Sequence, residues 1–187
     1  GGVTGLVLFN NKGDIVDKVP MPVGDLGGAK GDGYGYDIAI NPAKNTMLTS
    51  SFTGWNNYMM DLGKLVKDGE AMKRFGNTMV LWDLKSMKPK QVFSVPGSPL
   101  EIRWSLKEGD NWAITAAALT SKLWLVKQDG AGQWQAKEVA TIGDPGFAYA
   151  RLMTQLWGTM ALRFANAELL PFDVPTYASA VESFIRQ

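Results

Sequence analysis

The chain repeats one pattern of strands and turns, and this repeat limits the folds that it can adopt. Residues 36–52 and 100–117 each contain a short β-rich run, a polar turn and a second β-rich run. Each is followed by an apolar stretch that ends in a further polar turn, at 77–95 and 121–142. Self-similar units of this kind indicate a repeat architecture, because each unit needs its neighbours to bury its apolar face.

The order of these segments predicts a mainly β fold. Residues 5–22 have the strand–turn–strand form of half a unit, so half a unit precedes two whole ones. Each whole unit supplies the four short antiparallel strands of a propeller blade. We therefore expect a partial β-propeller of about two to three four-stranded blades. The periodicity leaves an unrelated antiparallel sandwich or barrel open as the alternative.

Two stretches interrupt the repeat. Residues 54–76 indicate either a short helix that covers one end of the blades or a surface loop. The apolar face of this helix would hold Met59, Leu62, Leu65, Val66 and Met72. The glycine-rich stretch 24–35 lacks the Gly-Lys-Ser/Thr ending of a phosphate-binding loop, and we interpret it as a connection between blades.

The character of the sequence changes after Gly143, which divides the chain into domains 1–143 and 144–187. Large apolar residues recur near every fourth position after Phe147, which predicts an amphipathic helix. Asp173 is suited to cap a second helix, so we expect a C-terminal α-helical hairpin.

Such a hairpin is too small to bury its apolar stripe alone. We therefore expect residues 147–185 to pack on another chain in an oligomer, or on sequence beyond this chain. The expected partners are the remainder of the propeller or another protein chain.

The composition excludes several kinds of chemistry. The 187 residues contain no cysteine and no histidine, which removes thiolate nucleophiles and the most common metal ligand. A net charge of +1 gives no reason to expect nucleic acid or an anionic membrane as partner. No apolar run reaches the length of a membrane span. The first residues read as a cut or processed end, and the compartment stays open, with periplasm or secretion favoured over cytoplasm.

Three motifs in a fixed order resemble the selenium-binding protein and methanethiol oxidase family. They are Gly35-Tyr36-Asp37, Val80-Leu81-Trp82-Asp83 and the run 99–103, Pro-Leu-Glu-Ile-Arg. The resemblance covers residues 1–143 and implies that the chain is part of a propeller of about seven blades. It also implies copper-dependent thiol oxidation for a full-length family member.

One departure from this family concerns the metal. The family places a metal-binding histidine before the Trp-Asp strand, and Thr78 occupies that position here. The other family histidines lie outside this chain. We therefore expect no metal ligand and no cofactor from this chain alone, with copper possible in the full-length protein.

The tail resembles a different family. The runs 144–149, 162–166 and 170–173 are similar to the C-terminal dimerisation region of glutamate carboxypeptidase-like zinc peptidases. That resemblance implies helices at a dimer interface, without zinc ligands.

Four residues are candidates for ligand binding. Glu101 and Arg103 are separated by one residue, so strand alternation puts both on one face. A carboxylate and a guanidinium that face a propeller channel could bind a small polar ligand, and the alternative is a structural ion pair between blades. Tyr36 and Asp37 could line the same channel, or Asp37 could accept hydrogen bonds at a strand edge.

The sequence thus predicts a scaffold or ligand-binding wall of a selenium-binding, methanethiol oxidase-like propeller, without catalytic residues of its own. Whether the chain is an enzyme stays open. Two alternatives remain: a dimerisation element of a zinc peptidase assembly, and a non-catalytic propeller that serves as an interaction platform.

Overall fold

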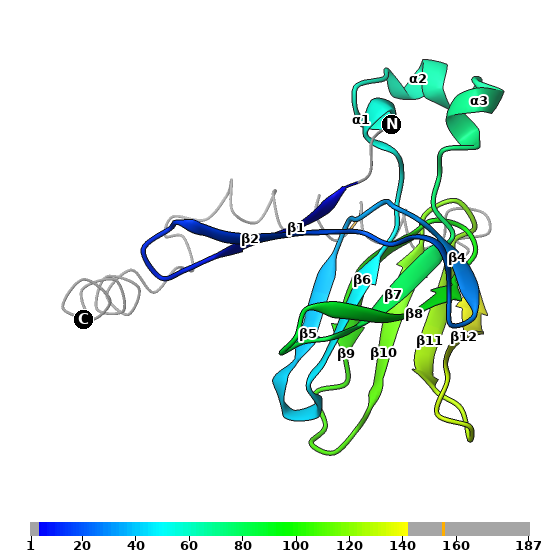
Figure 1. Ribbon diagram of the computed structural model, residues 1–187. Coiled ribbons are helices and arrows are strands. Elements are labelled where there is room, and N and C mark those ends of the chain that lie inside the picture. Colours follow the sequence, from blue (N-terminus) through cyan, green and yellow to red (C-terminus); the bar gives the residue numbers. More distant parts are fainter. Residues whose placement is uncertain (1–3, 142–154, 156–187) are drawn as a thin grey trace, which may run out of the picture. The chain divides into compact units, whose positions relative to one another are not determined.

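The computed structural model describes residues 4–141 and residue 155, and residues 4–141 belong to one compact unit (Figure 1). The described residues form twelve β-strands, three one-turn α-helices and one 3₁₀ turn. The strands pair into two four-stranded and two two-stranded sheets, and each paired strand runs antiparallel to its neighbour. The prediction of a mainly β chain is confirmed. No helix among these residues is long and apolar enough to cross a membrane.

The two larger sheets are meanders, in which each strand pairs with the next along the chain. The predicted repeat is confirmed at this level, because each whole unit of the sequence forms one such sheet. The first consists of β5 (Ile38–Asn41), β6 (Thr46–Ser50), β7 (Thr78–Asp83) and β8 (Lys88–Ser94). The second consists of β9 (Pro99–Trp104), β10 (Trp112–Ala117), β11 (Lys122–Gln128) and β12 (Trp134–Thr141).

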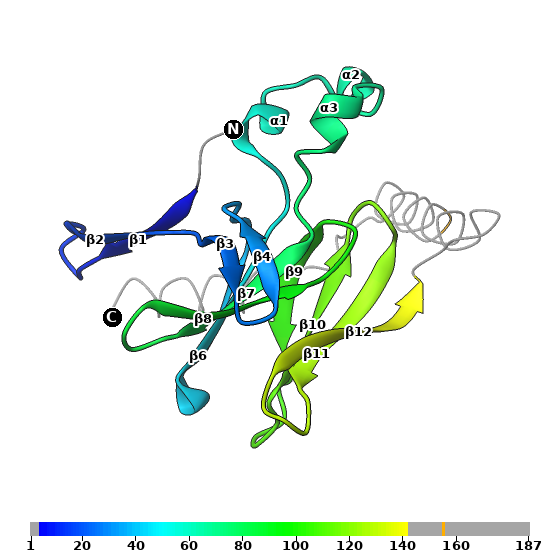
Figure 2. The ribbon, with the colours of Figure 1, turned by 45° about the vertical axis from the view of Figure 1, so that its right-hand side comes forward.

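The main core lies between these two sheets, which stand side by side in Figures 1 and 2. Alternation along each strand directs one set of apolar side chains to this interface. Leu48 and Met79 from the first sheet meet Ile102 and Val126 from the second, and all four are fully buried. Removing this apolar surface from water is the main favourable term that holds the sheets together.

The other face of the first sheet is covered by the N-terminal hairpins. Met47, Val80 and Trp82 are buried there against Leu6 and Met21. The indole N–H of Trp82 donates to Thr49 Oγ1 at 2.9 Å, so burial leaves no polar group of this side chain without a partner. The covering strands are β1 (Gly5–Phe9) with β2 (Ile15–Pro20), and β3 (Val23–Leu26) with β4 (Ala29–Asp32).

The glycine-rich stretch is not a simple connection, since it folds into the β3–β4 hairpin that packs on β7 and β8 (Figure 2). Its turn uses Gly27 at φ +64°, a backbone conformation that favours glycine. The stretch therefore lies between the β1–β2 hairpin and the first meander, as a connection would, but it forms strands of its own.

The inserted residues 54–76 form neither one helix nor a plain loop. They contain α1 (Trp55–Tyr58), α2 (Leu62–Leu65) and α3 (Gly69–Met72), each a single turn. Asp61 and Asp68 cap α2 and α3 by accepting backbone N–H groups. Of the apolar face predicted for a single helix, Leu65 is buried, whereas Met59 is 77% exposed.

The Trp-Asp pair has a structural role. Asp83 closes the β7–β8 turn by accepting the backbone N–H and the hydroxyl of Ser86, at 2.9 and 2.8 Å. These bonds, with Lys90 at 3.2 Å, lower the pKa of Asp83 from 3.8 to about 2. Asn45 donates to the same carboxylate at 2.8 Å, which ties the β5–β6 turn to the β7–β8 turn.

The two larger sheets are also joined by side chains at both of their edges. At one edge, the backbone N–H of Ile102 donates to Asp37 Oδ2 at 2.6 Å. At the opposite edge, the buried Gln91 donates to the carbonyl of Trp134 at 2.8 Å and accepts from its N–H at 2.9 Å. Each side chain therefore pairs with backbone groups that an edge strand would otherwise leave without partners.

The number of propeller blades stays a prediction, because two complete meanders do not define a closed ring. The α-helical hairpin predicted for 144–187 lies outside the described residues.

Replacing Gln91 with leucine should destabilise the chain. The variant leaves the buried N–H and carbonyl of Trp134 without partners, which we expect to lower the free energy of unfolding by about 1–3 kcal/mol. Urea unfolding followed by tryptophan fluorescence measures this change. The matched control is Gln135→Leu, at an exposed position on β12, which should change stability by less than about 0.5 kcal/mol. Equal effects of the two substitutions would contradict the proposed role of Gln91.

Candidate functional site

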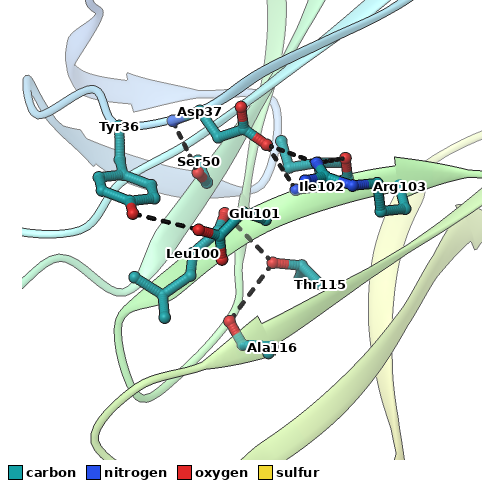
Figure 3. Close-up of polar contacts among 9 residues, drawn as sticks. All are labelled: Tyr36, Asp37, Ser50, Leu100, Glu101, Ile102, Arg103, Thr115 and Ala116. Atoms are coloured by element: carbon teal, nitrogen blue, oxygen red, sulfur yellow. Dashed lines mark hydrogen bonds and ion pairs between the residues drawn. The ribbon is translucent and has the colours of Figure 1, made fainter. Parts of the chain in front are cut away.

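The four residues predicted from the sequence meet where the first and second sheets adjoin (Figure 3). The hydroxyl of Tyr36 donates to Glu101 Oε1 at 3.2 Å. Arg103 Nη1 lies 3.4 Å from Asp37 Oδ2 in an ion pair. Each pair thus joins the segment directly before β5 to β9, and its members are more than sixty residues apart in the sequence.

Local hydrogen bonds fix the segment that precedes β5. The backbone N–H of Tyr36 donates to the carbonyl of Ser50 at 2.9 Å, and the N–H of Asp37 donates to the Ser50 hydroxyl at 3.2 Å. On β9, Glu101 and Arg103 are exposed while Ile102 between them is buried. This confirms that Glu101 and Arg103 share one strand face.

The ion pair at this edge joins Arg103 to Asp37 and not to Glu101, and Asp37 also accepts a hydrogen bond from the edge strand β9, which is the alternative predicted for it. The Asp37 carboxylate accepts both the Ile102 N–H and the Arg103 guanidinium, and its side chain is 25% exposed. The Arg103 side chain is 68% exposed, and an ion pair in that setting adds at most about 1 kcal/mol. Asp37 therefore joins the two sheets, whereas the outer surface of Arg103 stays accessible.

The electrostatic environment of Tyr36 reflects its neighbours. Partial desolvation, followed by the nearby negative charge of Glu101 and the hydrogen bond to it, raises the pKa of the Tyr36 phenol. The phenol thus remains a hydrogen-bond donor at neutral pH, and Glu101 is left with a second oxygen that can accept from a ligand.

An aromatic group beside the four residues was not identified from the sequence. The ring centroid of Phe52 lies 5.3 Å from that of Tyr36, 5.5 Å from that of Phe75 and 5.9 Å from that of Tyr58. Edge and tilted contacts of this kind attach the 54–76 insertion next to the candidate site. The sequence feature that indicates this group is the presence of an aromatic residue near each end of the insertion, Phe52 and Phe75.

Thr78 does not provide a copper ligand. Its hydroxyl donates to Asp32 Oδ2 at 3.3 Å, and Ser51 donates to the same carboxylate. Hydroxyl and carboxylate oxygens suit hard cations, whereas copper favours imidazole or sulfur ligands. Residues 4–141 and 155 contain no group of three or more acidic, histidine or cysteine side chains that could hold a metal. The residues present here do not fit copper.

One comparison concerns a peptidase. A probable glutamate carboxypeptidase of Zea mays is 43% identical over 44 residues, which cover 24% of this chain and 6% of that protein. A similarity of this extent does not assign the chain to a peptidase family, and it gives the predicted dimerisation role no support.

The remaining comparisons cover most of the chain. The family described as 56 kDa selenium binding protein (SBP56) matches residues 24–156. A methanethiol oxidase of Hyphomicrobium sp is 70% identical over 144 residues, which cover 77% of this chain and 32% of the relative. A methanethiol oxidase of Ruegeria pomeroyi is 55% identical over 152 residues, which cover 78% and 35%. The chain therefore spans about a third of the length of these relatives, and it belongs to the selenium-binding protein (SBP56) family.

Proposed function

We propose that this chain is a segment of a β-propeller and that the edge shared by β5 and β9 forms one wall of a ligand-binding channel. The observation that carries the proposal is the meeting of Tyr36, Glu101 and Arg103 at the junction of two neighbouring sheets. In propellers the sheets surround a central channel, and functional side chains from different blades meet there.

The chemistry of this wall suits a small polar ligand. Arg103 offers guanidinium N–H groups, Tyr36 a hydroxyl, and Glu101 a carboxylate oxygen. The chain contains no histidine or cysteine, so any thiol oxidation by a complete protein would draw its metal ligands from sequence beyond this chain. The segment then acts as scaffold and binding wall. Methanethiol is the probe that the names of the relatives suggest.

The proposal also accounts for apolar surface that the described sheets leave accessible. Ile38 and Ile40 on β5 are 52% and 54% exposed. On the second sheet, Ile114, Leu123 and Leu125 lie on the face opposite the main core and are only partly buried. A further sheet on each side would cover these residues, as neighbouring blades do in a propeller. The partner is then the remainder of the same propeller.

A second candidate function, an interaction platform, is favoured by one observation. Trp55, Met59 and Leu62 on the 54–76 insertion are 60%, 77% and 72% exposed. Large apolar residues gathered on one segment are typical of protein contact sites. In this alternative the β5–β9 edge would bind no small ligand.

Titration with methanethiol under anaerobic conditions separates the two candidates. We expect backbone amide shifts in nuclear magnetic resonance spectra to centre on Tyr36, Glu101 and Arg103, because the thiol donates to the Glu101 carboxylate. Glu101→Gln should weaken these shifts, whereas Glu108→Gln, at an exposed turn position, should leave them unchanged. Shifts confined to 54–76, or none at all, would reject the ligand-binding wall.

The contact between Tyr36 and Glu101 can be tested by pH. Glu101→Gln removes a negative charge and should lower the pKa of Tyr36 toward its ordinary value of 10.0. The raised pKa contributes stability that is present below pH 10.0 and is lost as pH rises through the folded-state pKa. Ultraviolet titration of tyrosinate, with Tyr36→Phe to identify the signal, measures the shift. An unchanged titration would contradict the contact.

The open sheet faces predict self-association of the isolated chain. Sedimentation velocity should show oligomers, and Leu125→Glu should shift the distribution toward monomer by placing a charge on the open face. Leu106→Glu is the matched control, because Leu106 is fully exposed in the β9–β10 turn. A monodisperse wild-type monomer that unfolds cooperatively would argue against an incomplete propeller.

A further inference from the structure

A cavity of about 480 Å³ opens between the two larger sheets, at the end where β5 turns into β6 and β11 turns into β12. It lies at neither the β5–β9 edge nor the 54–76 insertion, since it shares no lining residue with them. Its volume falls within the range of small-molecule sites. The polar side chains of its lining include Lys44, Lys90, Asn111, Gln128 and Gln133.

The charge of this cavity favours an anion. Among the residues that the structure describes, its lining includes two lysines and no carboxylate. Lys90 pairs with the neighbouring Asp83 at 3.2 Å, so these two charges largely offset each other. Lys44 makes no ion pair with any residue in the part of the chain that the structure describes. Lys44 therefore brings to the cavity a positive charge that no described carboxylate pairs with directly, although Asp129 lies beside the lining residue Gln133 and accepts its N–H at 2.9 Å.

Two lining residues of the cavity are held by mutual hydrogen bonds, and other lining amides are available for hydrogen bonding. Gln91 and Trp134 line the cavity and are joined by two reciprocal hydrogen bonds. Asn111 Nδ2 makes a long contact of 3.4 Å with Gln128 Oε1, and Asn111 Oδ1 is buried without a partner. The Gln133 side chain makes no hydrogen bond within residues 4–141 and is exposed. These amides can donate to and accept from a ligand without breaking strong contacts.

From this lining we propose that the cavity is a binding site for a small organic oxyanion with further hydroxyl groups, such as a hydroxycarboxylate. The Lys44 ammonium contacts the anionic group, and the amides of Asn111 and Gln133 bind the hydroxyl groups. The site is independent of the ligand-binding wall, because the two share no residue.

Calorimetric titration of the chain with citrate tests this site, and inorganic phosphate and glycerol serve as comparisons. We expect saturable binding of citrate that weakens with added salt, weaker binding of phosphate, and no binding of glycerol. Lys44→Ala should weaken citrate binding by about five-fold, the effect of losing one solvent-screened charge contact. Lys67→Ala makes the same charge change on the 54–76 insertion and should leave the affinity unchanged.

The position of the ligand is tested separately. Citrate should shift the amide signals of Gly132 and Gln133, and Asn111→Leu should reduce both the shifts and the affinity. Thermal unfolding of each variant establishes that it is folded. Equal losses of affinity in Lys44→Ala and Lys67→Ala would show general electrostatic attraction and overturn the proposal. Absence of saturable binding, or shifts centred on Glu101 and Arg103, would overturn it as well.

Discussion

The arrangement depends on face-to-face packing of two four-stranded meanders that are joined at both edges. Leu48 and Met79 pack against Ile102 and Val126 in a core without solvent exposure. Apolar packing alone is not directional and would allow the sheets to slide or rotate. Asp37 at one edge and Gln91 at the other pair with specific backbone groups of the neighbouring sheet. These hydrogen bonds fix the angle between the two sheets and the alignment of their edge strands, which the apolar core defines less strictly.

The same constraint positions both candidate sites. Because Asp37 holds the beginning of β5 against β9, Tyr36 comes within hydrogen-bond distance of Glu101. At the opposite edge of the sheets, the hydrogen bonds between Gln91 and Trp134 hold two residues that line the polar cavity. A change in the packing of the sheets should therefore alter both sites together, although they share no residue.

Sequence periodicity predicted the strands of both meanders because alternation and turn residues are local signals. It also placed Glu101 and Arg103 on one face, which needs only the geometry of a strand. It did not reveal that Asp37 accepts the N–H of Ile102, since that contact joins residues 65 positions apart. The periodicity of 54–76 predicted one helix and not three single turns, because it does not show that Asp61 and Asp68 each cap a new short segment. The β3–β4 hairpin was missed because glycine-rich sequence carries little alternation.

Hydrogen exchange of two backbone amides in the intact chain tests the central account most directly. The N–H groups of Ile102 and Trp134 belong to edge strands and point away from their own sheets, toward Asp37 and Gln91. If the two side chains join the sheets, both amides should exchange as slowly as those in the centre of each meander. The Gln91→Leu variant should speed up the exchange of the Trp134 amide and leave that of the Ile102 amide slow. Fast exchange of both amides in the wild-type chain, at the rate of open strand edges, would contradict the account.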